Sequence, residues 1–303
     1  MRILVAIPHF YRAGPVRALH ASGRAVARDT RRRALARSIL QLKGLFGDGV
    51  AFGANYADRR LETVPAAMGG IDVALVTDGR NHLIDGLNIP PGWFHHLAVP
   101  GDPRHLGFAC HRFLAENASG YDFVAYVEDD ILIHDPLFFH KLSLFNQAAG
   151  NPRALLVPHR FEVPIDLPQA SSVGAARIYP DLSAVTASAP HDPQRLTINW
   201  LGRPAVLEVA RNVHSGCWAL TRDQMALFVA NPTYQQTEPV WVTPLDMAAS
   251  YTIRAAFRVF KPTADSVFYL EVEHASPLVA SQIDGREADG RPRWRPQEVP
   301  KAG

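Results

Sequence analysis

The sequence predicts one large α/β domain with a mostly parallel central sheet and helices on both of its faces. Three observations indicate this class. Continuous apolar runs without alternation, such as residues 3–7, are typical of strands buried on both faces. Segments with helical spacing lie between these runs. The 303 residues, 47% hydrophobic and 20% charged, can form a sizeable core.

The first half of the chain alternates strands and helices. Leu35, Ile39, Leu42 and Phe46 recur at helical spacing, and Gly47 follows as a stop signal. We expect Asp135 to cap a later helix and Pro136 to occupy its first position. The expected strands are 3–7, 71–79, a short one within 94–103, and 122–130, and the expected helices are 31–46, 105–121 and 136–150.

After residue 150 the strands shorten and Pro, Gly, Ser and Ala become frequent. Residues 170–193 have weak periodicity and predict a long, partly ordered loop. The expected strands are 154–163, 205–210, 217–221, 257–262 and 266–274, and the expected helices are 222–231 and 243–257. We expect residues 1–283 to form one domain and residues 284–303 a poorly ordered tail.

Composition excludes several classes of protein. The net charge of +2 gives no electrostatic case for nucleic-acid binding. No stretch reaches the roughly 20 apolar residues of a spanning helix, and Pro8 ends the first apolar run without a cleavage site. The two cysteines, Cys110 and Cys217, fit a reducing compartment, so we expect a cytoplasmic protein.

Residues 12–43 contain nine basic side chains and a single acid, Asp29. One interpretation is a solvated helix face. The other is a site for an anionic substrate or peripheral contact with the anionic inner face of a membrane.

Three consecutive acids, Glu128, Asp129 and Asp130, end the buried strand at 122–130. Ligands bind beyond the carboxyl ends of strands in parallel sheets, and Asp78 ends another strand in the same way. Mg²⁺ and Mn²⁺ sites that serve phosphates often use only one or two carboxylates. The acids therefore predict a divalent-cation site, with a capped or salt-bridged turn as the alternative.

With these residues in view, the chain resembles glycosyltransferases of the GT-A fold, and residues 126–136 are similar to the family's DxD motif with Glu in first place. The resemblance implies that Asp130 binds Mn²⁺ or Mg²⁺ on the diphosphate of a nucleotide sugar. It also implies that Glu128 contacts the ribose or a metal-bound water and that Asp129 lies near the donor sugar.

Other segments extend the resemblance. Pro8, in the sequence IPHFY, lies where the family takes in its nucleotide, and Asp78 is similar to the acid that pairs with the base. Gly216 and Trp218 belong to a segment that resembles the lining of the sugar sites. Gly216 would allow close approach, and Trp218 would either stack on a sugar ring or pack in the core.

Two late residues complete the expected site. Asp246 resembles the acid that acts as general base on the acceptor hydroxyl in inverting members, although the family more often has Glu-Asp where this chain has Leu245-Asp246. The alternative is an acid favoured by a helix dipole. His274 resembles a third metal ligand and would favour Mn²⁺.

The resemblance thus implies a metal-dependent glycosyltransferase, with residues 1–135 binding the nucleotide sugar and residues 136–283 a glycan, lipid-linked or protein acceptor. Inversion with Asp246 as base is expected, and retention stays open. One alternative is a nucleotidyltransferase, although residues 7–17 lack the glycine run of its phosphate loop. Another is a non-catalytic nucleotide- or sugar-binding protein.

Overall fold

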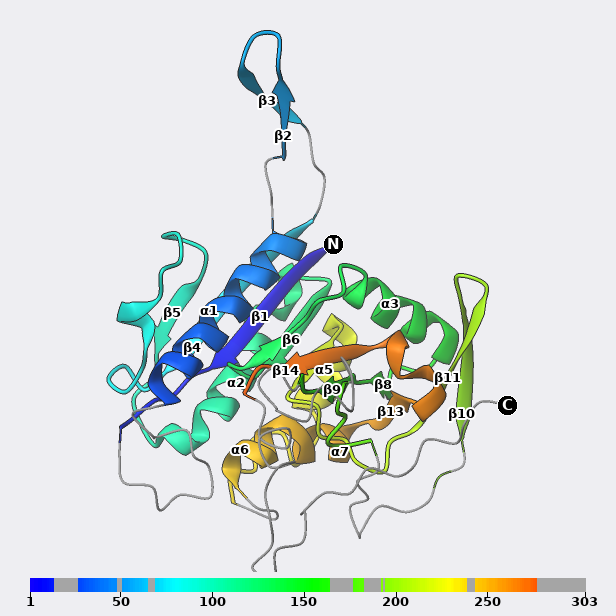
Figure 1. The fold of residues 1–303 in the computed structure, drawn as a ribbon. Helices are drawn as coiled ribbons and strands as arrows, with labels where there is room; N and C mark the ends of the chain where they lie inside the picture. The colour runs from blue at the N-terminus through cyan, green and yellow to red at the C-terminus, as the bar shows by residue number, and fades with distance from the viewer. Residues whose placement is uncertain are drawn as a thin grey trace, which may run out of the picture.

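The computed structural model describes residues 1–13, 27–47, 51–64, 69–163, 177–182, 192, 194–238 and 243–276. These residues form a mixed α/β structure with four sheets (Figure 1). None of the helices within these ranges is long and apolar enough to cross a membrane. The expected tail at 284–303 and most of the expected loop at 170–193 lie outside the described residues.

The largest sheet has five strands in the order β12-β6-β1-β4-β5. Four of them are parallel, and β12 runs antiparallel beside β6. The strands are β1 (Arg2–Pro8), β4 (Gly70–Thr77), β5 (His95–Ala98), β6 (Phe123–Val127) and β12 (Cys217–Leu220). The carboxyl ends of β1, β4, β5 and β6 therefore meet at one edge of the sheet, which confirms the expected central sheet in this coarse form.

Helices cover both faces of this sheet. Alternate residues of the buried strands point to opposite faces, so one strand contributes to two core clusters. Val5 and Ile7 pack in one core cluster with Leu35 and Ile39, and Leu4 packs in the other. The first cluster contains residues of α1 (Ala27–Phe46) and α3 (Phe138–Ala149), and the second contains residues of α2 (Leu106–Asn117) and α5 (Arg222–Val229).

Two smaller sheets complete the body. One has the order β7-β14-β9 and consists of β7 (Ile131–Leu132), β14 (Glu271–His274) and β9 (His159–Phe161). The other has the order β10-β11-β13-β8 and consists of β10 (Arg195–Trp200), β11 (Arg203–Val209), β13 (Arg258–Pro262) and β8 (Ala154–Leu156). The expected strand at 154–163 is thus two strands in different sheets, which Pro158 separates.

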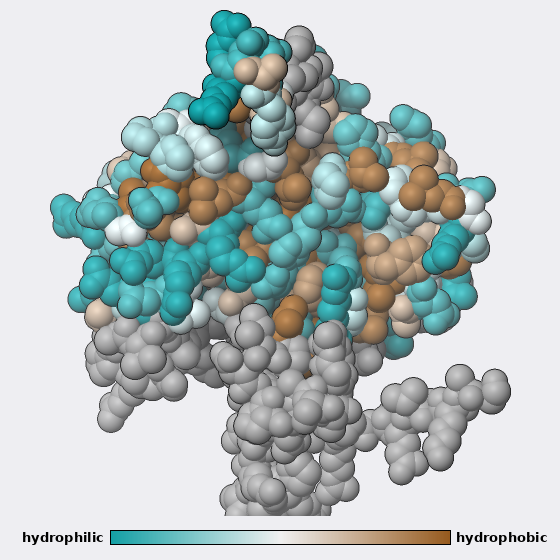
Figure 2. Space-filling model, turned by 45° about the horizontal axis from the view of Figure 1, so that its top comes forward, coloured by the Kyte–Doolittle hydropathy of each residue, from teal (hydrophilic) through white to brown (hydrophobic). Residues whose placement is uncertain are grey.

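A two-stranded hairpin, β2 (Ala51–Asn55) and β3 (Arg60–Val64), follows α1 and was not predicted. It projects from the body in Figure 1, and its tip is hydrophilic in Figure 2, where the apolar side chains of the visible face form separate patches. Short helical turns occur at Ile84–Gly86, Pro103–His105, Ala118–Gly120 and Ala264–Tyr269.

The helix expected after the acids begins later than predicted. Leu137 is the residue before α3, and Asp135 instead accepts a hydrogen bond from the Leu137 amide at 2.8 Å. Asp135 also pairs with Lys141 of α3 at 2.6 Å. It therefore stabilises both the turn before α3 and the first turn of the helix, although it is not the capping residue. The helix expected at 243–257 is three consecutive pieces: α6 (Pro244–Asp246), a π-helical turn (Met247–Tyr251) and α7 (Thr252–Ala256).

Candidate functional site

The three consecutive acids lie between β6 and β7, at the edge where the parallel strands end. The Glu128 amide donates to the Gly216 carbonyl at 2.8 Å, and the Ile131 amide donates to the Glu128 carbonyl at 3.1 Å. The acids thus form a turn between the two strands and not the extended strand end expected from the sequence, and the three carboxylates have different surroundings. Each of them therefore has its own set of partners.

Asp129 points toward α1 and is fully engaged. Arg31 donates from Nη2 to both carboxylate oxygens, at 3.0 and 2.8 Å, and His9 Nδ1 lies 2.5 Å from Oδ2. The Leu83 amide donates to His9 Nε2 at 3.1 Å, so His9 carries its proton on Nδ1 and donates it to Asp129. Asp129 thus ties together the end of β1, the loop after β4 and α1, whereas the resemblance implied a place near the donor sugar.

Within the described part of the arginine-rich segment, only some of the basic side chains belong to a solvated helix face, which was one of its two interpretations. Arg31 binds Asp129, Arg37 lies 3.5 Å from a carboxylate oxygen of Glu273, and Lys43 donates to the Ile71 carbonyl at 2.6 Å. Asp129 chiefly raises the pKa of Arg31 against the effect of burial. Arg28 and Arg33 are exposed, as a solvated face requires.

Asp130 faces the late histidine. Its Oδ2 lies 3.4 Å from Nε2 of His274, and Nδ1 of the same ring lies 2.9 Å from Oε1 of Glu162. Burial favours neutral His274, but Asp130 and Glu162 outweigh it and raise the pKa of His274 to about 10. Burial likewise opposes ionisation of Asp130, and the nearby His274 and Arg31 outweigh it and lower the pKa of Asp130.

The three-stranded sheet explains this arrangement. His274 pairs with Ile131 in the antiparallel register of β14 with β7, and the Ala275 amide donates to the Asp130 carbonyl at 2.8 Å. In the parallel register of β14 with β9, Glu273 pairs with Phe161, which places Glu162 beside His274. Asp130, which directly precedes Ile131, and Glu162, which directly follows Phe161, therefore lie on either side of His274.

Glu162 was not predicted from the sequence, because it follows a short strand and belongs to no motif. It is only 1% exposed, a value that a carboxylate rarely has without a charged partner. Its partner His274 is 112 residues away in the chain. An acid within the strand expected at 154–163 was the available signal.

Glu128 is partly buried on the side toward β12, next to Gly216. Burial and the neighbouring Asp130 raise the pKa of Glu128 to about 7. Gly216 has φ +65°, and a Cβ there would lie 2.9 Å from a carboxylate oxygen of Glu128 and from two side-chain carbons of Ile131. Gly216 thus allows a close approach, although the group that it approaches is Glu128.

Trp218 is a core residue. Its side chain is 1% exposed and stacks on Tyr126 with ring centroids 5.5 Å apart and an interplanar angle of 12°. His111 and Phe228 pack edge-on against the same ring. This favours core packing, the second of the two interpretations given for Trp218, since no face of the indole is free for a sugar.

Asp246 is the last residue of the short helix α6. Thr243 caps this helix, and its hydroxyl donates to Asp246 Oδ2 at 2.7 Å while it accepts from the Asp246 amide at 3.2 Å. The π-helical turn that follows contains Ser250, whose hydroxyl lies 2.9 Å from His214 Nδ1. A π-helical turn is rare and is often found at functional sites.

A buried polar cluster interacts electrostatically with both Asp246 and the acids. Arg160 pairs with Asp181, and Lys261 donates to the His214 carbonyl at 2.5 Å. Burial, with some relief from Asp181, lowers the pKa of Lys261 to about 8. Arg160 also interacts electrostatically with Glu128. The acids are thus balanced in part by cations of the chain itself.

The residues expected at the nucleotide pocket lie at the ends of β1 and β4. Pro8 is the last residue of β1 and is buried beside Val76. Asp78 accepts from the amides of Arg80 and Asn81 at 2.9 and 2.7 Å and from the Asn81 side chain at 2.6 Å. Asp78 therefore shapes its own turn, and these hydrogen bonds lower its pKa in spite of burial.

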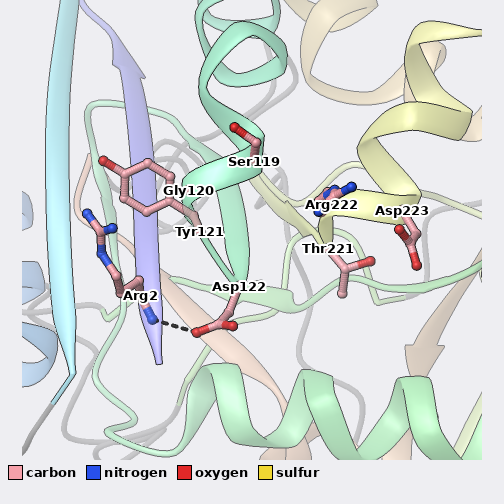
Figure 3. A pocket seen from close by; sticks show the side chains of 8 residues that line it. All are labelled: Arg2, Ser119, Gly120, Tyr121, Asp122, Thr221, Arg222 and Asp223. Carbon is pink, nitrogen blue, oxygen red and sulfur yellow. Dashed lines mark hydrogen bonds between the residues drawn. The ribbon is translucent and has the colours of Figure 1, made fainter.

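One cavity, of about 410 Å³, lies at the other edge of the central sheet, near the amino-terminal ends of β1 and β6 (Figure 3). Its lining mixes acids and bases, and the Arg2 amide donates to Asp122 at 2.7 Å. Its position sets it apart from the acids that follow β6. The lining residues are Arg2, Ser119, Gly120, Tyr121, Asp122, Thr221, Arg222 and Asp223.

Across the described residues, no group of three or more His, Cys, Asp or Glu side chains is arranged as a metal centre. Two protein ligands are nevertheless enough for cations that take their remaining ligands from phosphates and water. Asp130 and His274 form such a pair, and Glu162 supplies the carboxylate that a metal-bound histidine usually has behind it. The residues therefore fit a divalent cation.

Comparison with models of known protein families and with curated protein sequences gave no match.

Proposed function

We propose that this protein is a divalent-cation-dependent glycosyltransferase of the GT-A type that uses a nucleotide-diphosphate sugar. One observation carries the proposal: Asp130 and His274 face each other at 3.4 Å where the parallel strands end, with Glu162 behind the histidine. This is the edge at which open α/β sheets bind ligands. The order of the strands and the helices on both faces are compatible with this type of fold.

In the proposed site, Asp130 and His274 hold Mn²⁺ or Mg²⁺. When bound, such a cation supplies Lewis-acid stabilisation of the charge that develops on the nucleoside diphosphate. His274 favours Mn²⁺, because imidazole is a better ligand for Mn²⁺ than for Mg²⁺. Asp129 does not compete for the cation, since Arg31 and His9 engage both of its oxygens.

The other residues of the chain bind and orient the substrates. Glu128 lies two residues before Asp130 and next to Gly216, which places its carboxylate to hydrogen-bond a substrate hydroxyl. Asp246 takes the proton of the acceptor hydroxyl, and the Thr243 hydroxyl holds its carboxylate in place. Attack of this oxygen on the anomeric carbon, from the face opposite the breaking bond to the nucleoside diphosphate, would give inversion.

A panel of UDP-, GDP-, CDP- and ADP-sugars tests this proposal through release of the nucleoside diphosphate in the presence of Mn²⁺. Transferases of this kind should release it slowly to water even without the acceptor. We expect release from one nucleotide class, its loss on addition of EDTA, and its loss in Asp130→Ala. Absence of release from all donors would count against a transferase.

One observation favours the alternative of a non-catalytic binding protein. The carboxylate of Asp246 is already satisfied by Thr243 at the start of a helix, as a purely structural acid would be. Asp246→Asn separates the two: a transferase loses turnover and keeps its affinity for the nucleotide, whereas a binding protein loses nothing. A nucleotidyltransferase would instead release pyrophosphate or a nucleoside monophosphate in the same assay.

A further inference from the structure

Glu162 is a buried acid whose backbone cannot move freely. Its amide donates to the Ile178 carbonyl at 2.8 Å, and its carbonyl accepts from the Ile178 amide at 3.0 Å. Its side chain is almost fully enclosed, at 1% exposure, and Oε1 lies 2.9 Å from Nδ1 of His274. The carboxylate is therefore fixed behind the histidine ring, on the side away from Asp130.

We infer that Glu162 is a positioning residue that orients His274 for a divalent cation shared with Asp130. This inference rests on the cation site of the proposed function. Glu162 accepts the Nδ1 proton of His274, so Nε2, 3.4 Å from Asp130 Oδ2, is the nitrogen that would give up its proton and bind the cation. A carboxylate behind the ring fixes its tautomer and orientation and makes Nε2 a stronger ligand.

A second carboxylate–histidine pair, Glu273 with His134, provides a comparison, since Glu273 precedes His274 on β14. Glu273 Oε2 lies 2.6 Å from Nε2 of His134, but Nδ1 of that ring is occupied by Gln41 at 2.7 Å. Arg37 also pairs with Glu273. Both nitrogens of His134 are therefore used within the chain, whereas Nε2 of His274 faces a carboxylate, which is itself a candidate ligand.

The test is the affinity for Mn²⁺ alone, measured from the electron paramagnetic resonance signal of free Mn²⁺ during titration of the whole protein. Glu162→Gln keeps the size of the side chain and removes its charge, so it should weaken Mn²⁺ binding by about 10–100-fold. Glu273→Gln removes the charge of the matched pair and should leave the affinity unchanged. Thermal unfolding of each variant reports whether the fold is retained.

A double variant separates positioning from a purely structural role. Because Glu162 acts through His274, Glu162→Gln should add no further loss to the Mn²⁺ affinity of His274→Ala. Additive losses, or a Glu162→Gln variant with the wild-type affinity, would overturn the inference. If Glu162→Gln does not fold, Glu162→Asp, which withdraws the carboxylate by one methylene, should show the same loss.

The same titration distinguishes this inference from the proposed function. If the wild-type protein binds no Mn²⁺ either alone or with each of UDP, GDP, CDP and ADP, the cation site itself is wrong, and the role of Glu162 falls with it. If the wild type binds Mn²⁺ and the Asp130→Ala variant does not, the cation site stands. The result for Glu162→Gln then decides the inference alone.

Discussion

Gly216 shows how one residue controls the surroundings of the acids. Its φ of +65° disfavours any residue with a Cβ, and that atom would also meet Glu128 and Ile131 at 2.9 Å. Its carbonyl holds the Glu128 amide. The close approach of β12 to the acids therefore depends on the absence of a side chain at this position.

We predict that Gly216→Ala destabilises the protein by more than the strain of the backbone alone. Gly202 provides the control, since its φ is +78° but a Cβ added there would have nothing within 4 Å. Gly202→Ala should cost about 1–2 kcal/mol of unfolding free energy for the left-handed conformation. Gly216→Ala should cost more in a denaturant titration, and equal costs would show that the contact with Glu128 is relaxed without penalty.

Single residues also show where sequence reasoning succeeds. The resemblance implied that Asp130 and His274 bind one cation, and the structure places them 3.4 Å apart, while their role as ligands stays a prediction. The two interpretations of Trp218, sugar stacking from the resemblance of its segment and core packing, could not be separated from the sequence, because its burial depends on Tyr126, His111 and Phe228 from other elements. Residue type does not determine such contacts.

At the scale of elements, Asp129 connects three segments that are distant in the sequence. It binds His9 at the end of β1 and Arg31 in the second turn of α1, and through His9 it reaches the Leu83 amide beyond β4. Removing charges from water costs free energy. A buried ion pair therefore stabilises a protein only when its geometry is good and its remaining polar atoms are hydrogen-bonded. The acid is thus part of the frame of the candidate site.

We predict that Asp129→Asn leaves Arg31 without its closest charged partner and destabilises the protein by about 3 kcal/mol or more, the range for breaking a buried pair. The control is Asp58→Asn, which breaks the exposed pair of Asp58 with Arg60 and should cost less than about 1 kcal/mol. Chemical unfolding measures both. A loss in Asp129→Asn no larger than in the control would contradict the role of Asp129 as a link between elements.

The elements that could be predicted best from the sequence are those with local signals. The parallel strands were found from continuous apolar runs, and α1, α2 and α5 from their spacing and stop signals. The hairpin of β2 and β3 was missed, because residues 51–64 contain no continuous apolar run, and its described side chains, residues 53–63, are exposed or half-buried. The start of α3 was placed too early, because the Asp135-Pro136 signal forms a separate turn.

At the scale of the whole molecule, several histidines are buried in their neutral form. His111 is 0% exposed within an aromatic cluster, and burial lowers its pKa to about 3. Burial and the nearby Lys261 lower the pKa of His159 to about 4. Between these values and the ordinary 6.5, the unfolded chain binds protons that the folded one does not, so stability falls as the pH falls below 6.5.

We predict that lowering the pH from 6 to 5 costs roughly 1 kcal/mol of stability for each of these two histidines. His111→Phe, which preserves an aromatic ring in the cluster, should reduce the loss over this interval by roughly that amount. His140→Gln removes an exposed histidine and should leave the loss as in the wild type. Urea titrations at the two pH values measure it, and an unchanged loss in His111→Phe would contradict the prediction.

The group of Asp130, His274 and Glu162 is a property of the whole fold, since Asp130 precedes β7, Glu162 follows β9 and His274 ends β14. Sequence patterns report local structure, and the pairing of β14 with both β7 and β9 is not local. The general position of the site at the carboxyl ends of the strands was predictable. The partner that fixes His274 was not.

The central claim is that a cation held by Asp130 and His274 binds a nucleoside diphosphate at the edge of the parallel sheet. Calorimetric titration of UDP, GDP, CDP and ADP into the wild type and Asp130→Ala, with and without Mn²⁺, tests it most directly. We predict that one nucleotide binds tightly and that its binding needs both Mn²⁺ and Asp130. Binding that is absent for all four nucleotides, or equally tight without Mn²⁺ and in Asp130→Ala, would contradict the claim.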